Sequence, residues 1–467
     1  MDFISKKRLN SEKEMWYDKI PMNGSKKLII YRKVKSEFEY YYPEDGYQKF
    51  DKGECEKLFH NAFSRELKKY DCILYRVYDL KTPLSEQWPK IMEANEIMKQ
   101  MTYKKSTNPK FPDYCVDITT TGLTKPTVLK HLMIHSAWFK EIPNCNPVYE
   151  YFEYDFVENA SHGPITWCEP YEGYVHMVDI DSMYPSIYGA DENFYFPKRF
   201  TNRLYEFDTI PDAFQFGIYN NIKLEFPEGT HKIAKMALTH HNGYYTHYEL
   251  KLAKMLNAKI VKKDDNKLVG AIIYPDGDLL SHRFFANYLT HLKAIKTLPR
   301  FKQARPIAKE MMNSLWGIMC EKKKDTCLYN GYNEKPYGRK TLDFNYKDWG
   351  VEDATDLDVN WKLDKESGEF VISSIWKRSR QYTGPFPRIK PFILTFARCK
   401  MIKLALGFDE DDIIRIHTDS FWLKKQYGIT IPKNDGNDIG KLQYEGYHHV
   451  NLKSLNNFTR NEQQPCQ

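Results

Sequence analysis

The sequence predicts a mixed α+β fold, because it contains helical and strand-like segments long enough to pack against one another. Four stretches have the spacing typical of helices: residues 84–101, 247–256, 284–295 and 307–320, the last with Pro306 suited to its first turn. Strand-like order is found at 174–180, which ends at an Asp, and at 413–423, which favours two strands joined by a turn. We also expect a turn at Tyr184-Pro185-Ser186 and ordered apolar structure at 389–406.

Length and composition bound the class of protein. At about 150 residues per domain, the 467 residues are enough for about three domains. Lys and Arg number 69 and Asp and Glu 62, a net charge of +7, which is compatible with a polyanionic partner without requiring one. Hydrophobic residues make up 42% and aromatic residues 15%, which excludes a disordered chain.

The sequence also lacks several signals. It has no apolar run of about 18 residues and no secretory signal at its start, so no membrane is expected as a partner. The nine cysteines form no Cys-x-x-Cys pair, so neither a disulfide framework nor a zinc site is expected. We therefore expect a soluble intracellular protein.

Two aspartates carry the first candidate chemistry. Asp179 and Asp419 each end a strand-like segment, although they lie far apart in the sequence. Carboxylates held on neighbouring strands can bind a pair of Mg²⁺ ions about 4 Å apart, an arrangement that activates a hydroxyl and stabilises a reacting phosphate. Taken singly, each Asp is equally explained as a surface turn residue, because Asp is common in turns.

A cationic segment carries the second candidate chemistry. From Leu279 to Lys309 the chain has no Asp or Glu, yet it contains several Lys and Arg residues. On a helix, Lys309, Asn313 and Trp316 share one face, and Gly317 leaves room for close approach. A cation, an amide and a flat ring on one face suit a nucleoside triphosphate. The alternative is a solvated basic face beside an ordinary buried Trp.

Three motifs in this order resemble those of family B DNA polymerases. They are Asp179-Ile180-Asp181-Ser182-Met183-Tyr184-Pro185-Ser186-Ile187, then Lys309-x-x-x-Asn313-Ser314-x-Trp316-Gly317, then His417-Thr418-Asp419-Ser420. The nearest likeness is to the protein-primed polymerases of phages, linear plasmids and related viruses. Residues 158–167 are similar to the YxGG loop of that group, 395–398 to its conserved Arg element, and 440–445 to the family's GKLxxE stretch. The resemblance covers roughly residues 124–453.

The resemblance implies an architecture. It is α+β, with a right-hand polymerase palm (an antiparallel sheet with helices), helical fingers and a small N-terminal α/β domain like an exonuclease remnant. We expect residues 1–120 to form a degenerate exonuclease-like domain. Residues 121–282 would be the first part of the palm with an insertion, and residues 283–325 the fingers. Residues 326–385 would be a second insertion, and residues 386–467 the second part of the palm with little or no thumb.

The resemblance also implies a role for each matching residue. Two Mg²⁺ ions, for which Mn²⁺ can substitute, are bound by Asp179, Asp419 and the Ile180 carbonyl, and Lys309 assists catalysis by neutralising phosphates. The residues expected to bind the nucleotide are Ser182, Tyr184, Lys309, Asn313, Trp316 and, more weakly, Lys302, Arg305 and Lys296. Tyr184 would exclude a ribose 2′-hydroxyl. The residues expected to bind DNA are Ser161, Gly163, Arg398, His417, Thr418, Lys441 and Lys453. For Arg398 the expected role is support of the template or of the active-site strands.

The function implied is template-dependent DNA synthesis from dNTPs on a DNA template and primer, for a viral, plasmid or other mobile genome. A terminal protein or a second polymerase subunit is left open as a further partner. The chain departs from the family pattern in four ways. Trp316 replaces a Tyr, which would alter nucleotide selection. The other three departures support an alternative, a catalytically impaired nucleic-acid-binding subunit or one part of a split polymerase. The first of them is His417, which replaces an Asp. Only one segment, residues 75–79, is similar to an exonuclease motif of the family, and chance explains that match equally well. No editing activity is therefore expected. Lys453 is the only candidate for the KxY primer motif, so a full thumb is not expected.

Overall fold

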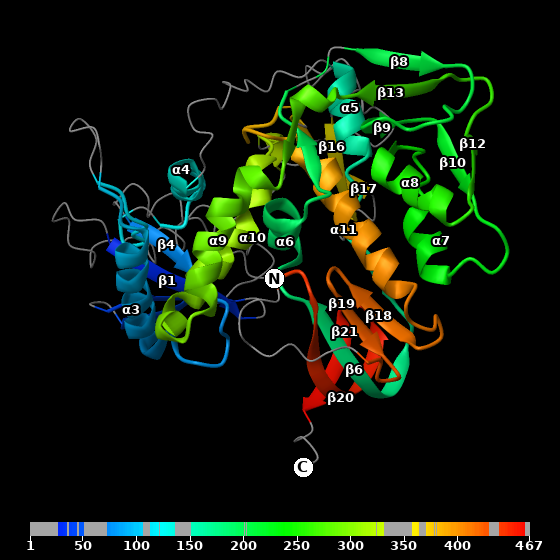
Figure 1. Ribbon diagram of the computed structural model, residues 1–467. Coiled ribbons are helices and arrows are strands. Elements are labelled where there is room, and N and C mark those ends of the chain that lie inside the picture. The colour runs from blue at the N-terminus through cyan, green and yellow to red at the C-terminus, as the bar shows by residue number, and fades with distance from the viewer. Residues whose placement is uncertain are drawn as a thin grey trace. The chain divides into compact units, whose positions relative to one another are not determined.

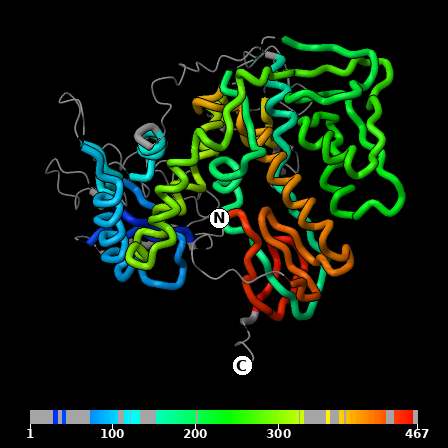
Figure 2. The backbone as a smooth tube through the Cα atoms, viewed as in Figure 1, coloured from blue at the N-terminus to red at the C-terminus, as the bar shows by residue number. Residues whose placement is uncertain are grey.

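The computed structural model describes these parts of the chain: residues 27–34, 37–43, 46–50, 72–105, 113–120, 122–135, 151–199, 201, 203–323, 325–330, 357–363, 370–377, 379, 381–428 and 439–462. The chain divides into two units, and each is described by itself below (Figures 1 and 2). The first unit comprises Met1–Glu141, Arg283–Leu315 and Ile431–Lys441. The second comprises Ile142–His282, Trp316–Thr430 and Leu442–Gln467.

The first unit contains a four-stranded sheet in the order β3-β2-β1-β4. Its strands are β1 (Lys27–Val34), β2 (Glu37–Tyr42), β3 (Gly46–Phe50) and β4 (Cys72–Arg76). Strand β1 pairs in parallel with β4 and antiparallel with β2, so this sheet is mixed. The helical elements of this unit are α3 (Leu84–Thr102), α4 (Lys125–His135), α9 (Arg283–Thr297) and η2 (Pro299–Ala304). Helix α10 (Arg305–Met319) begins in this unit, and the division between the units falls within it.

The second unit is built around a six-stranded sheet in the order β21-β20-β6-β19-β18-β5, in which every pair is antiparallel. Its strands are β5 (Thr166–Cys168), β6 (Tyr171–Ile180), β18 (Ile413–His417), β19 (Ser420–Leu423), β20 (Leu442–Ser454) and β21 (Asn457–Glu462). Buried Val175 and Met177 of β6 pack with Trp422 of β19 and Val450 of β20, so the strands that carry the motifs share one core cluster.

Helices of the second unit surround α11 (Ile389–Ala405), which packs against α6 (Met183–Ala190), α7 (Lys232–Leu238) and α8 (His247–Met255) (Figure 1). Twelve residues of α11 are buried, which explains its nearly continuous apolar sequence. Helix α5 (Tyr151–Asn159) also contacts α11. Thus α11 is the central helix of this unit.

Four smaller sheets complete the second unit, in the strand orders β10-β12, β11-β9-β13-β8, β14-β7 and β15-β17-β16. Between α6 and α9 the elements are β7 (Tyr195–Pro197), β8 (Leu204–Phe207), β9 (Gly217–Tyr219), β10 (Ile222–Glu225), β11 (Tyr245–Thr246), β12 (Lys259–Lys262), β13 (Val269–Ile273), η1 (Asp276–Asp278) and β14 (Leu279–Ser281). After α10 come β15 (Thr326–Asn330), β16 (Leu357–Leu363) and β17 (Phe370–Lys377).

The mixed α+β class predicted from the sequence is confirmed, and so are the four predicted helices, which are α3, α8, α9 and α10. The predicted hairpin is β18–β19, and residues 389–406 form α11. The predicted division into five segments stays a prediction. Within the described residues, no helix is both long and apolar enough to cross a membrane.

One local prediction was wrong. Tyr184-Pro185-Ser186 is not a turn but part of α6, and the chain turns earlier, at Asp181-Ser182. Pro185 is compatible with the helix because it lies in the first turn, where the backbone N–H groups have no partner within the helix. Ser182 makes the sharp change of direction, with a φ of 51°.

Candidate active site

The antiparallel pairing of β6 with β19 brings Asp179 and Asp419 to the same edge of the six-stranded sheet. Asp179 lies directly opposite Ser420, the residue that follows Asp419. The backbone N–H of Ile180 donates a 2.9 Å hydrogen bond to the carbonyl oxygen of Asp419. Both aspartates are partly exposed. The backbones of two aspartates that are distant in sequence are therefore neighbours in the fold, and their joint binding of metal ions stays a prediction.

Left-handed backbone conformations flank both aspartates. Among the described residues, four other than glycine have positive φ: Ser182, Asn221, Asn257 and Thr418. Asn tolerates this conformation, but a β-branched Thr adopts it rarely. The backbone N–H of Asp419 bonds the carbonyl of His417 at 2.8 Å, so Thr418, with a φ of 63°, is the centre of a γ-turn. Such strain is typical of functional sites, and here it lies in the residue directly before Asp419.

An aromatic pair lies beside Asp419. The ring of Tyr184, from α6, stacks on that of Trp316, from α10, with centroids 5.1 Å apart and planes inclined by 27°. Burial and the nearby charge of Asp419 raise the pKa of Tyr184 to about 12, while Arg398 acts in the opposite direction. The Tyr184 hydroxyl is therefore neutral, and the stacked rings form a flat aromatic surface near Asp419. The roles of Tyr184 and Trp316 in nucleotide binding stay predictions.

Arg398 is buried beneath this site. Its guanidinium, on α11, donates hydrogen bonds to the carbonyl oxygens of Gly163 (2.6 Å) and Ala237. Burial lowers the pKa of Arg398, and the charge of Glu249 opposes that effect. Of the two roles expected for Arg398, these contacts favour support of the active-site backbone over direct contact with the template.

The loop at 160–165 connects Arg398 to the hairpin that bears Asp419. Gly163 of this loop is exposed and bonds Arg398, and the carbonyl of Ile165 accepts the backbone N–H of Thr418 at 2.9 Å. Ser161 is half-buried, and its hydroxyl bonds the Val157 carbonyl at 2.5 Å. The loop therefore supports the strained tip of the β18–β19 hairpin.

The other expected DNA-binding residues lie along the sheet. His417 ends β18 and is partly exposed, and its carbonyl accepts the hydroxyl of Ser420 at 3.1 Å. Lys453 is exposed in β20, and Lys441 is exposed just before that strand. Their binding of DNA stays a prediction.

The predicted phosphate-binding residues belong to the first unit. Lys302 in η2 and Arg305, Lys309 and Asn313 in α10 are exposed. Lys296, in contrast, is only 5% exposed in α9, so its charge is not available at the surface. A Cβ added to Gly317 would meet no atom within 4 Å among the described residues, which agrees with the expected room for close approach.

Asp79, the exonuclease-like candidate, follows β4 and is exposed. Its Oδ1 accepts the backbone N–H groups of Lys81 (2.8 Å) and Thr82 (3.2 Å), closing a turn before α3. Hydrogen bonds, of which that with the Thr82 side chain is the strongest, lower its pKa. Asp79 thus stabilises the turn before α3, and an exonuclease role for it stays a prediction.

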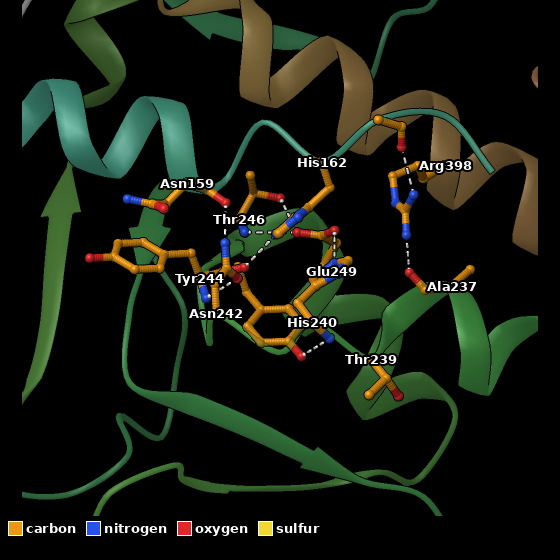
Figure 3. Close-up of polar contacts among 12 residues, drawn as sticks. Asn159, His162, Ala237, Thr239, His240, Asn242, Tyr244, Thr246, Glu249 and Arg398 are labelled. Carbon is orange, nitrogen blue, oxygen red and sulfur yellow. Dashed lines mark hydrogen bonds and ion pairs between the residues drawn. The ribbon is translucent and has the colours of Figure 1, made fainter. Parts of the chain in front are cut away.

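Sequence reasoning missed a buried group of one glutamate and two histidines near the loop. Glu249 on α8 bonds His240, whose ring stacks on that of His162 (Figure 3). One signal was available: Thr246-x-x-Glu249 is a capping-box pattern, which predicts the start of α8 and the position of Glu249 in its first turn. Nothing in the sequence indicates that His240 and His162 meet this carboxylate.

The donor set at the sheet edge fits Mg²⁺. Within the described part of the chain, no group of three or more His, Cys, Asp or Glu residues could hold a metal ion. Mg²⁺ needs fewer protein ligands than that, because it is usually bound by one or two carboxylates together with waters and substrate phosphates. Asp179 and Asp419 provide two hard oxygen ligands on a rigid edge, and both are accessible.

Comparison with known proteins gave matches to solved structures. No family model and no curated protein matches the chain. The chain is similar to Phi29 DNA polymerase complexed with single-stranded DNA, with 14% identity, a TM-score of 0.48 and coverage of 93% of this chain and 87% of that chain. It is also similar to the same polymerase in its post-translocation binary complex with primer-template DNA (15% identity, TM-score 0.47, coverage 91% and 85%). In its fold the chain is similar to the phi29 protein-primed family B DNA polymerase.

Proposed function

We propose that the chain is a DNA-directed DNA polymerase that transfers deoxynucleotides to a primer under the direction of a template. One observation carries the proposal. Asp179 and Asp419 meet at the edge of an antiparallel sheet, where the hydrogen bond from Ile180 to Asp419 fixes their backbones relative to each other. Three motifs with the order and residue types of a polymerase site support the same reaction.

The chain's own residues would supply positioning and charge. Asp179 and Asp419 would hold two Mg²⁺ ions, with the Ile180 carbonyl as a further ligand. When bound, these ions supply activation of the primer hydroxyl and stabilisation of the charge that develops on the phosphates. Thr418 directs Asp419 through its γ-turn, so the carboxylate needs little rearrangement before the reaction.

Nucleotide selection would depend on the aromatic pair and on the cations of α10. Tyr184, held against Trp316 by stacking, would lie under the sugar and collide with a 2′-hydroxyl. Ser182 would lie along the triphosphate. Lys309 would neutralise the charge of the phosphates, and Lys302 and Arg305 would contribute more weakly. Asn313 would line the nucleotide pocket.

Two finer parts of the proposal rest on the sequence motifs. The chain has no functional 3′–5′ exonuclease, and it replicates a viral, plasmid or other mobile genome. Ser161, Gly163, His417, Thr418, Lys441 and Lys453 would contact the DNA.

Primer extension on a defined template tests the proposal. The wild-type chain should add dNTPs in Mg²⁺ or Mn²⁺, and Asp179→Asn and Asp419→Asn should each reduce the rate about a thousandfold or more, because each removes a metal-binding charge. Asp411→Asn is the matched control, since Asp411 is exposed in the turn before the opposite end of β18 and should not affect the rate. Full activity of either active-site variant would refute the assignment. Binding of primed DNA without incorporation in either metal would favour a catalytically impaired subunit, for which His417 in place of Asp is the specific observation.

A further inference from the structure

A buried carboxylate lies behind the active-site loop, and the reaction proposed above does not use it. Glu249, in the first turn of α8, has a side chain that is 0% exposed, and its Oε1 lies 2.8 Å from Nε2 of His240, whose side chain is 6% exposed (Figure 3). Burial alone would raise the pKa of Glu249, but the charge and hydrogen bond of His240 outweigh burial and lower it to about 2. Glu249 is therefore ionised at neutral pH inside the protein.

A second histidine connects this pair to the loop. The ring of His162 stacks on that of His240, with centroids 3.5 Å apart and planes inclined by 13°. Nε2 of His162 lies 2.9 Å from the carbonyl oxygen of Tyr244. Since a carbonyl only accepts, Nε2 carries a proton and donates it. His162 is thus held both by the ring of His240 and by the backbone beside it.

The segment that contains His240 also bonds the chain just before the loop that contains His162. Nδ2 of Asn242 donates to the Asn159 carbonyl at 2.8 Å, just before the loop. The backbone N–H of Tyr244 donates to Oδ1 of Asn242 at 3.1 Å, which orients that amide (Figure 3). The position of segment 239–246 therefore determines the position of the loop.

Arg398 holds the loop from the other side. Its guanidinium bonds Gly163 in the loop and Ala237 in α7, and its Nε has no hydrogen-bond partner among the described residues. Glu249 is the carboxylate whose charge stabilises this buried cation. Glu249 thus interacts with both His240 and Arg398. Removing its negative charge would weaken two contacts of the same loop, that of His240 with His162 and that of Arg398 with Gly163.

The loop meets the catalytic hairpin at Ile165, directly before β5, which pairs with β18. The carbonyl of Ile165 accepts the backbone N–H of Thr418 at 2.9 Å. Thr418 has a strained, left-handed backbone, and such a conformation persists only where its surroundings hold it. A displacement of Ile165 would allow the γ-turn to relax and Asp419 to turn away from Asp179.

We propose that Glu249 and His240 are positioning residues that hold loop 160–165, through His162 and Arg398, in the place that keeps Asp419 directed for metal binding. In this role both residues act through the loop and not by contact with a substrate or a metal ion. The kinetic part of this inference rests on the proposed polymerase function, whereas the loop-holding part does not.

The substitution Glu249→Gln separates this role from the structural role of Glu249 in α8. Oε2 of Glu249 also accepts the backbone N–H of Thr246 at 3.0 Å, which caps the helix. Glutamine keeps an acceptor oxygen of the same length, so the cap remains while the charge is lost. Glu228→Gln is the control, because Glu228 is exposed in a turn of the same unit and the substitution changes the net charge equally.

Single-turnover primer extension provides the kinetic test. In Glu249→Gln and in His240→Gln, the maximal rate of incorporation should fall about ten- to hundredfold, since small displacements of a reacting group have effects of this size. The Mg²⁺ concentration for half-maximal rate should rise, and the Kd for dNTP should stay within about twofold of the wild-type value. The two effects should not add in the double variant, because both residues act on one loop. Unchanged rate and Mg²⁺ dependence in a folded Glu249→Gln variant would overturn the proposal.

Amide hydrogen exchange gives a test that needs no polymerase activity. Exchange at residues 160–168 and 418–420 should be faster in Glu249→Gln than in the wild type or Glu228→Gln, while exchange in β20 and β21 should be unchanged. If exchange is faster in Glu249→Gln and the wild-type chain does not extend primers, the polymerase function is refuted and the loop-holding role is retained. Unchanged exchange in the loop would refute that role.

Discussion

The backbone N–H of Ile180 donates a hydrogen bond to the carbonyl oxygen of Asp419 across 2.9 Å. This contact joins the end of β6 to the tip of the β18–β19 hairpin, and these two segments carry the first and the last of the sequence motifs. Because the contact involves backbone atoms, it fixes where both aspartates start from the sheet and uses neither carboxylate. Four predictions follow from this site and its surroundings.

Tyr184→Ala should relax discrimination against ribonucleotides. The ring of Tyr184 is fixed by its stack on Trp316, so its loss opens space beside Asp419. The ratio of kcat/KM for dNTP to that for the matching rNTP should fall about 10- to 100-fold. Tyr184→Phe is the control and should keep the ratio, since the ring and not the hydroxyl provides the barrier. An unchanged ratio in Tyr184→Ala would make Tyr184 a core residue only.

Lys309→Ala should raise the KM for dNTP about tenfold or more, because an exposed cation on α10 would lose its contact with phosphate. Lys309→Arg should recover part of the loss. Lys403→Ala removes the same charge from the exposed end of α11 and should leave KM unchanged. Equal effects of the two alanine variants would indicate a general effect of net charge rather than a nucleotide contact.

Glu153→Gln should destabilise the second unit strongly. The carboxylate of Glu153 on α5 forms two 2.8 Å hydrogen bonds with the guanidinium of Arg388 at the start of α11, and the two side chains are 0% and 6% exposed. Without that carboxylate, a buried cation is left uncompensated, which should lower the free energy of unfolding by about 3–5 kcal/mol in urea denaturation. Glu225→Gln breaks an exposed ion pair with Lys223 and should cause no measurable change. A small effect of Glu153→Gln would show that Arg388 finds water or another partner.

His247 should make stability depend on pH. Burial lowers its pKa to about 3, from an unfolded value near 6.5. Between these values the unfolded chain binds a proton that the folded chain does not, so stability should fall as the pH falls from 6.5 toward 3. The slope from this group is at most about 1.4 kcal/mol per pH unit. In His247→Gln, urea denaturation at pH 7 and pH 5 should show a smaller loss of stability on acidification than in the wild type. An equal loss would assign the dependence to other groups.

Local features of the fold were predictable from the sequence. Apolar periodicity indicated α3, α8, α9 and α10, and an apolar run ending at Asp179 indicated β6, because these patterns depend on neighbours within a few residues. The turn at 184–186 was the local failure. Pro in the first turn of a helix and Pro in a turn give the same short sequence signal, and the packing of α6 against α11 decided between them.

The sequence by itself determined which residues could do chemistry: two strand-end aspartates, a Tyr, a Trp and a cationic helix, in an order that resembles a polymerase. Only the tertiary structure decided that β6 lies between β19 and β20, that Tyr184 stacks on Trp316, and that Arg398 holds Gly163. It also decided that Glu249 meets His240 and His162. The reason is physical: periodicity reports which face of an element is buried, whereas the pairing of distant strands and the partners of a buried charge depend on how whole segments pack.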